Sequence, residues 1–142
     1  MVRSGSITSR RESRVLVLQS LCEADIVPHE VMDVLARLVE ENHILEDVEQ
    51  FSSDLVSNVL VNRVELDNII TSYASDWPLE QMALVDRNVL RMSLAEILWG
   101  AEAPQAAVIN EAIELAKGFG SERSPGFVNG VLGAFLESRT GN

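Results

Sequence analysis

The sequence predicts an all-α fold, and three observations point to it. Apolar residues recur at spacings of three and four through almost every segment, which is the period of an amphipathic helix. No window shows sustained alternation of apolar and polar residues between hairpin turns. With only 8 Gly and 4 Pro in 142 residues, the chain is also poor in the turns that a β-sandwich needs. The length suits a single domain, residues 1–142, built around one core.

The first half, over residues 8–75, is predicted to hold three helices, of which the third is the longest. Ser9 and Glu12 fit a capping box at the start of the first helix, and residues 1–7 before it are expected to be flexible. The second helix is expected to begin at Pro28, because proline suits a first helical position. The residues expected to face inward share the helical spacing: Val15, Leu18, Leu21 and Cys22, then Val31, Val34, Leu35 and Leu38, then Phe51, Leu55, Val59, Leu66, Ile69 and Tyr73.

The second half, over residues 79–138, follows the Asp-Trp-Pro tripeptide 76–78, where the residue before proline avoids helical geometry. Its first helix is expected to start directly after this boundary and to end at Gly100. Pro104 is expected to open the next helix, and Ser124 the last one. The sequence therefore predicts six or seven helices, packed as two three-helix halves.

Charge is distributed unevenly along the chain. The 11 basic and 22 acidic residues give a net charge of −11, which by itself argues against a nucleic-acid partner. Residues 1–14, however, carry four arginines and one glutamate, whereas residues 23–86 carry 15 acidic residues and two arginines. Three of the arginines, Arg10, Arg11 and Arg14, are expected to project together from the first helical turns. This asymmetry predicts a basic arm for polyanions on an acidic body, with a solubilising tail as the alternative.

The sequence gives no positive sign of catalysis or of a bound cofactor. Cys22 is the only cysteine, which excludes an internal disulfide and fits a reducing cytosol. His29 and His43 share no metal-ligand spacing, and no phosphate-binding glycine loop or nucleophile elbow occurs. No apolar run approaches the roughly 18 residues that cross a bilayer, and no secretory signal is recognisable. We therefore expect a cytoplasmic protein that is not an enzyme and has no cofactor, metal or membrane partner.

Several strings are more specific than helix formation requires. They are Arg-Arg-Glu-Ser-Arg at 10–14, Val-Asp-Arg-Asn-Val-Leu-Arg-Met-Ser-Leu-Ala-Glu-Ile at 85–97, Val-Ile-Asn-Glu-Ala-Ile-Glu-Leu-Ala-Lys at 108–117 and Phe-Val-Asn-Gly-Val-Leu at 127–132. In this order and spacing they closely resemble the NusB family of bacterial transcription antitermination factors. The resemblance implies an all-α fold of two perpendicular three-helix subdomains.

The resemblance also implies a function and a set of partners. The family binds the boxA element of nascent RNA, mainly from ribosomal RNA leaders, as a heterodimer with the small-subunit ribosomal protein NusE. That heterodimer joins NusA and NusG on RNA polymerase and suppresses premature termination.

Carried onto this sequence, the resemblance assigns RNA binding to six residues and NusE binding to one. They are Arg10, Arg11, Arg14, Gln19, Phe127 and Asn129 for RNA, and Asp86 for NusE. Guanidinium groups bind phosphates and stack on bases, so arginine suits single-stranded RNA. The chain departs from the family at Cys22 and Ala95, where tyrosine is common, and at Arg123, where an acid is frequent.

Other interpretations remain open for some of these residues. Instead of contacting RNA, Phe127 could be an aromatic residue of the core, and Asn129 could cap or bridge helices. Arg91 is expected to be buried against an acid such as Glu96 or Glu111 rather than to contact RNA.

Two other functions also remain open. One is a homodimeric protein-interaction module whose RNA surface is masked. The other is the RNA-binding module of ribosomal RNA cytosine methyltransferases, which is disfavoured because those chains continue into a large methyl-transfer domain and this one stops at Asn142.

Overall fold

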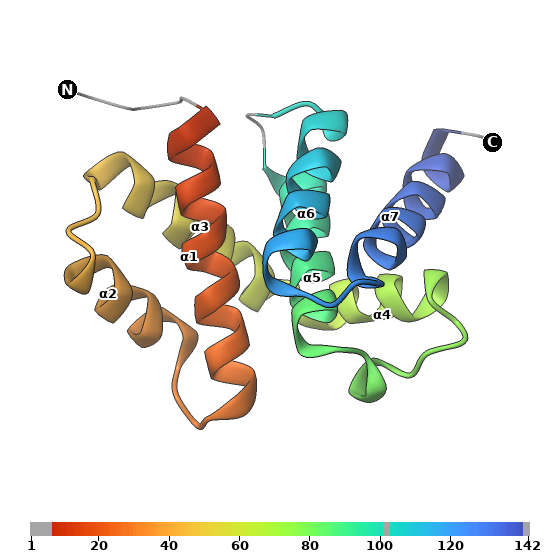
Figure 1. Ribbon diagram of the computed structural model, residues 1–142, viewed down its shortest axis with the longest axis horizontal. Coiled ribbons are helices and arrows are strands. Elements are labelled where there is room, and N and C mark those ends of the chain that lie inside the picture. The colour runs from red at the N-terminus through yellow and green to blue at the C-terminus, as the bar shows by residue number, and fades with distance from the viewer. Residues whose placement is uncertain (1–6, 101–102, 141–142) are drawn as a thin grey trace.

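The computed structural model describes residues 7–100 and 103–140 (Figure 1). These residues form seven α-helices and one 3-10 turn, and no strand occurs among them, which confirms the predicted all-α fold. The elements are α1 (Ile7–Ile26), α2 (Val31–Glu41), α3 (Glu46–Val61), α4 (Arg63–Tyr73), η1 (Leu79–Gln81), α5 (Leu84–Trp99), α6 (Gln105–Phe119) and α7 (Ser124–Thr140). The flexibility predicted for residues 1–7 falls, except for Ile7 at the start of α1, outside the described residues.

Helix α5 is the centre of the molecule. It packs against α1, α3, α4, α6 and α7, so residues 88–96 are all buried. Apolar side chains such as Leu90 and Leu94 fill the core there, but polar Asn88, Arg91 and Glu96 are buried in the same stretch. Buried polar groups need hydrogen-bond partners, so these side chains determine which residues of neighbouring helices lie against α5. None of the helices in the described part of the chain is long and apolar enough to cross a membrane.

The helices pack as two groups around this centre. Helices α1, α2 and α3 pack on one another, whereas α4 packs on α5 and α7, and α6 packs on both α5 and α7 (Figure 1). The two groups therefore separate at Asn62, between α3 and α4, which is earlier in the chain than the predicted division after residue 75.

The prediction of one long third helix is wrong. The chain breaks at Asn62, whose backbone leaves helical geometry and whose side-chain amide donates to the Asn58 carbonyl at 2.9 Å. The helical spacing of apolar residues continues from Leu55 to Leu66 across this break, so periodicity could not reveal it.

Two predicted helix starts are also wrong. Ser9 does not cap α1, because the helix has already begun at Ile7 and Ser9 lies buried inside it. The Ser13 hydroxyl donates to the Ser9 carbonyl at 3.0 Å, so this pair belongs to the helix interior. Helix α2 begins at Val31 rather than at Pro28, after a turn in which the His29 amide donates to the Val27 carbonyl.

The second half follows the predicted order with one exception. The helix expected directly after residues 76–78 is there only the short turn η1, and α5 begins at Leu84. Gly100 ends α5, Pro104 precedes the first residue of α6 and Ser124 begins α7, as predicted. The loop between α6 and α7 is short, so residues around 121–127 lie beside the start of α5, where they share a cavity described below.

Candidate nucleic-acid interface

The three arginines of α1 make different interactions, although Arg10 and Arg14 both lie beside the Phe51 ring of α3. The Arg10 guanidinium lies over the Phe51 ring of α3, Arg11 pairs with an acid of α6, and Arg14 pairs with an acid of α5. The expectation that they project together as an open basic arm is therefore wrong. Residues 10–14 are part of α1, so this segment is not a tail either.

Arg10 is half-buried against α3. Its guanidinium carbon lies 4.3 Å from the centre of the Phe51 ring, within the range of a cation–π interaction. Both residues line a cavity of about 400 Å³, together with Glu46, Asp47, Gln50 and Asp54. A phosphate that approached Arg10 here would meet three carboxylates, so this side of α1 is not an open basic surface.

Arg11 forms a two-point ion pair with Glu111. Its Nε lies 3.0 Å from Oε1 of Glu111 and its Nη2 lies 2.8 Å from Oε2. The Arg11 side chain is 57% exposed and the Glu111 side chain 14%. The hydrogen bond from Arg11 lowers the pKa of Glu111, and the same bond raises the pKa of Arg11. Arg11 is thus the most accessible of the three arginines, but a carboxylate already occupies one edge of its guanidinium.

Arg14 is buried in the core. Its Nε and Nη2 donate to the two carboxylate oxygens of Glu96 at 2.9 and 2.5 Å, and both side chains are 6% exposed. This pair joins α1 to α5. In this arrangement Arg14 offers no surface to a phosphate, so its predicted contact with RNA requires the side chain to leave Glu96.

Gln19 is exposed on α1, eight residues after Arg11. Eight residues of helix span about 12 Å, so the two side chains mark a stretch of α1 about two turns long. Gln19 has the accessibility that its predicted RNA contact needs.

Phe127 and Asp86 line the same cavity, at the start of α7 and of α5. The cavity has a volume of about 300 Å³. Its lining residues are Trp77, Gln81, Met82, Ala83, Asp86, Ser121, Arg123 and Phe127. The structure therefore brings together two residues that the sequence assigned to different ligands.

The two residues differ in how they face this cavity. Phe127 is half-buried and packs against the core, so it is a core aromatic with one accessible side. Asp86 is buried, and its Oδ1 has no hydrogen-bond partner among the residues that the structure describes. A buried carboxylate oxygen without a donor lowers the stability of the folded chain.

Asn129 lies in the second turn of α7 and is exposed. It is therefore not a helix cap. The cavity of Asp86 lies past the carboxyl end of α6, whereas Glu111 lies in the middle of that helix. The predicted site residues thus fall into two regions, one on α1 and one around the start of α7.

Arg91 is buried, as expected, but its partners are not Glu96 or Glu111. Its Nη1 donates to Asp25 at 3.1 Å and its Nε to Asp67 at 2.8 Å. Glu96 and Glu111 serve Arg14 and Arg11 instead. The expectation placed the right acids on the wrong arginine, because helical spacing does not say which helix faces which.

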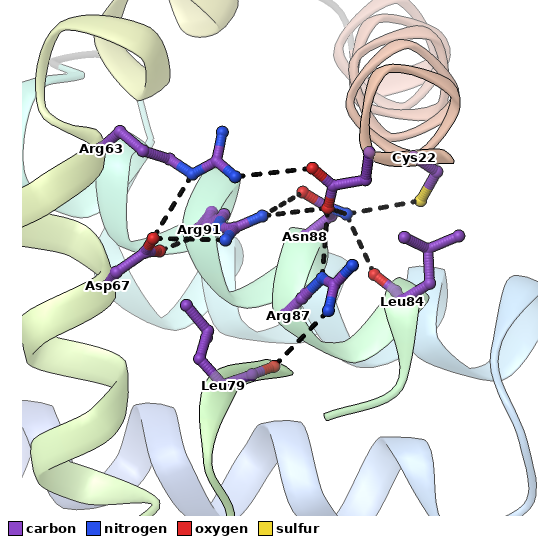
Figure 2. A network of polar contacts seen from close by, with 9 residues as sticks. Cys22, Arg63, Asp67, Leu79, Leu84, Arg87, Asn88 and Arg91 are labelled. Atoms are coloured by element: carbon purple, nitrogen blue, oxygen red, sulfur yellow. Dashed lines mark hydrogen bonds and ion pairs between the residues drawn. The ribbon is translucent and has the colours of Figure 1, made fainter. Parts of the chain in front are cut away.

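Asp25 is the centre of a polar network that ties the end of α1 to α4 and α5. Figure 2 labels its partners Arg63, Arg87, Asn88 and Arg91. Arg63, Arg87 and Asn88 also donate to its carboxylate. Burial acts to raise the pKa of Asp25, but these hydrogen bonds and the charge of Arg91 outweigh it and hold the pKa below its usual value. The network therefore fastens the carboxyl-terminal end of α1, whereas Arg14 and Glu96 fasten the helix near its middle.

Residues 11–137 match the sequence model of the NusB family. The chain belongs to the NusB family. Transcription antitermination protein NusB of Dehalococcoides mccartyi strain CBDB1 is 46% identical over 125 residues, which cover 88% of this chain and 87% of that protein. NusB of Herpetosiphon aurantiacus is 44% identical over 126 residues, covering 87% and 86%.

Solved NusB structures share the fold. T. maritima NusB superposes with a TM-score of 0.85 at 29% identity and 90% coverage of both chains. A chain from a crystal structure of antitermination factors NusB and NusE in complex with double-stranded RNA superposes with a TM-score of 0.85 at 25% identity, covering 93% of this chain and 98% of that one.

The NusB-family match begins at Arg11 and so includes every predicted site residue except Arg10. Sequence reasoning missed three residues that hold the arginines of α1: Phe51, Glu96 and Glu111. A signal existed for two of them, since Glu96 and Glu111 lie in the family-like strings at 85–97 and 108–117. An acid that lies among the apolar core positions of a helix is a candidate partner for an arginine elsewhere in the chain.

Proposed function

We propose that this chain is a transcription antitermination factor that binds boxA-type RNA of nascent ribosomal transcripts together with NusE. In this role it helps RNA polymerase to resist termination, in a larger complex with NusA and NusG. The proposal is supported above all by the NusB-family match over residues 11–137 and by relatives that carry the name transcription antitermination protein. The likeness to a NusB chain crystallised with NusE and RNA supports the choice of partners.

The accessible side of α1 is the proposed RNA-binding surface. Arg11 and Gln19 are exposed there, and a guanidinium can donate to phosphate oxygens or stack on a base. Phe127 and Asn129 at the start of α7 would contact a part of the RNA beyond the one bound by α1, with one side of the Phe127 ring accessible for stacking.

The Asp86 cavity is the proposed contact with NusE. Asp86 lines it and carries a negative charge, which would attract a basic side chain that enters the cavity. The acidic character of the whole chain, which has 22 acidic residues against 11 basic ones, suits a basic ribosomal protein. The role is that of a cytoplasmic adaptor and not of an enzyme.

A titration with boxA-like RNA and a scrambled RNA of equal composition tests the proposal. Each RNA is titrated with this protein alone and with NusE present, and binding is followed by fluorescence anisotropy. We expect NusE to strengthen binding of the boxA-like RNA more than that of the scrambled RNA. Equal affinity for both RNAs in the presence of NusE would contradict the proposal.

A homodimeric protein-interaction module is the alternative function. It is favoured by one observation: Arg10, Arg11 and Arg14, which we call the α1 motif, each already interact with a residue of this chain. Light scattering over a hundredfold concentration range distinguishes the two functions, because the alternative requires a dimer at high concentration.

A further inference from the structure

The contact between Arg11 and Glu111 has the geometry of an arginine bound to an anion. Two parallel hydrogen bonds, of 3.0 and 2.8 Å, join one edge of the guanidinium to both carboxylate oxygens. A phosphate group uses the same arrangement when it binds arginine. Glu111 therefore occupies the position that a phosphate of RNA would take on this edge.

Glu111 is well placed to keep that position. Its side chain is 14% exposed, whereas that of Arg11 is 57% exposed. Glu111 is therefore surrounded by the rest of the protein, and Arg11 lies on the solvent side of the pair. Glu111 also feels the charge of Arg14, and Glu114, one turn further along α6, adds a second negative charge near Arg11. Neither acid is part of the α1 motif, so the sequence of the motif alone gives no sign of them.

A phosphate can reach Arg11 in two ways, and Glu111 opposes both. If it binds the edge formed by Nε and Nη2, it must displace the carboxylate. If it binds the other edge, it comes close to a carboxylate of like charge. Contacts to phosphates are the same for every RNA, whereas contacts to bases carry the sequence information. Glu111 therefore weakens the part of RNA binding that does not depend on sequence.

We propose that Glu111 competes with RNA for the anion site of Arg11: by holding the guanidinium it weakens binding to phosphates by the same factor for every RNA, so that a stable complex depends on additional base contacts. This inference rests on the proposed RNA-binding function. It adds an acid of α6 to the interface, in the role of a competitor for the bound anion rather than a ligand.

The substitution Glu111→Gln tests this directly, with Glu114→Gln as the matched control. Both remove one negative charge from α6, but Glu114 is exposed and paired with Lys117 at 3.4 Å instead of with Arg11. Binding of scrambled and boxA-like RNA is measured for both variants at the same salt concentration. Glu111→Gln should tighten binding of scrambled RNA by roughly two- to fivefold, the range of an exposed ion pair, and tighten binding of boxA-like RNA by a similar factor. Glu114→Gln should change binding less.

A double-mutant cycle shows whether Glu111 acts through Arg11. In the Arg11→Gln background, adding Glu111→Gln should no longer change the affinity for scrambled RNA. The proposal is overturned if Glu111→Gln binds scrambled RNA no more tightly than the wild type, or if its effect persists without Arg11. Circular dichroism checks that all variants remain helical.

Failure of the proposed function gives a different result. If the wild type shows no preference for boxA-like RNA, antitermination through boxA is contradicted. The comparison of Glu111→Gln with the wild type on scrambled RNA still decides the role of Glu111.

Discussion

Arg14 and Glu96 meet inside the protein, 82 positions apart in the sequence, and hold each other by two hydrogen bonds at 2.9 and 2.5 Å. Each side chain is 6% exposed, so water can replace neither partner. An arginine that looks like an RNA contact in the sequence is therefore, in the folded chain, a link between α1 and α5. This distinction leads to the first prediction.

Replacing Arg14 should lower the stability of the folded protein rather than act directly on RNA binding. In Arg14→Met the Glu96 carboxylate is left buried without a partner, which typically costs about 3–5 kcal/mol. We expect a fall of this size in the free energy of unfolding, measured by urea denaturation. The double variant Arg14→Met with Glu96→Leu should recover much of the loss, because it removes both charges. Unchanged stability in Arg14→Met would show that the arginine is free in solution.

Replacing Arg11 should affect RNA binding and leave stability nearly unchanged. Arg11→Ala removes an accessible guanidinium, so the affinity for boxA-like RNA in the presence of NusE should fall. Where one phosphate contact is lost, the slope of log affinity against log salt should become less steep by about 1. Binding titrations at several salt concentrations measure both effects. Arg37→Ala, which removes an exposed arginine of α2, is the control.

Replacing Asp86 should weaken NusE binding at little cost to the fold. Oδ1 of Asp86 is buried without a partner among the described residues, which destabilises the free protein, whereas the position of Asp86 in the first turn of α5 is favourable for a negative charge. These effects oppose each other, so Asp86→Asn should change the free energy of unfolding by less than about 1 kcal/mol. Calorimetric titration with NusE should show clearly weaker binding than for Glu80→Gln, an exposed control in η1. Equal affinity for NusE in both variants would contradict the proposed contact.

The ionised Glu23 side chain should contribute to stability at neutral pH and lose this contribution as the pH falls from about 4.5 toward 2. Hydrogen bonds from Arg37 and His29 lower the pKa of Glu23 to about 2, from a usual value of 4.5. Because the folded pKa lies below the unfolded one, the contribution is complete above about pH 4.5 and is lost as the pH falls toward 2. The difference in Tm between the wild type and Glu23→Gln should therefore shrink over this range. A difference that stays constant from pH 6 to pH 2 would show that the carboxylate does not form these bonds in solution.

Cys22 should react slowly with alkylating reagents. Burial raises the pKa of its thiol to about 11, with a further contribution from the charge of Asp25. At pH 8 only about one thiol in a thousand is then ionised, and the thiolate is the reactive form. Modification by iodoacetamide, followed by mass spectrometry, should be much slower for the folded protein than in urea. Equal rates would indicate an accessible thiol.

The helices could be predicted from the sequence because the spacing of apolar residues within each helix shows which of its faces is buried. The spacing of Val15, Leu18 and Leu21 identifies one face of α1 without any knowledge of the partner. The break at Asn62 escaped prediction because the apolar spacing continues through it on both sides. Local signals such as Gly100 correctly ended a helix, but they do not say how the helices cross.

The candidate site was less predictable for the same reason. A family resemblance can point to Arg10, Arg11 and Arg14, but the acid that meets each arginine depends on the packing of α1 against α5 and α6. Arg11 and Glu111 are 100 positions apart, and no periodicity connects them. The charge of an isolated segment therefore overstated how basic the surface is.

The polar network around Asp25 has a consequence for the thermodynamics of binding. With the carboxyl-terminal end of α1 fastened there and its middle fastened by Arg14, the surface that carries Arg11 and Gln19 is already ordered in the free protein. RNA binding to this surface does not include the loss of conformational entropy that would accompany the folding of a disordered arginine-rich arm. Association should consequently show a small heat-capacity change, with most of the ordering taking place in the RNA.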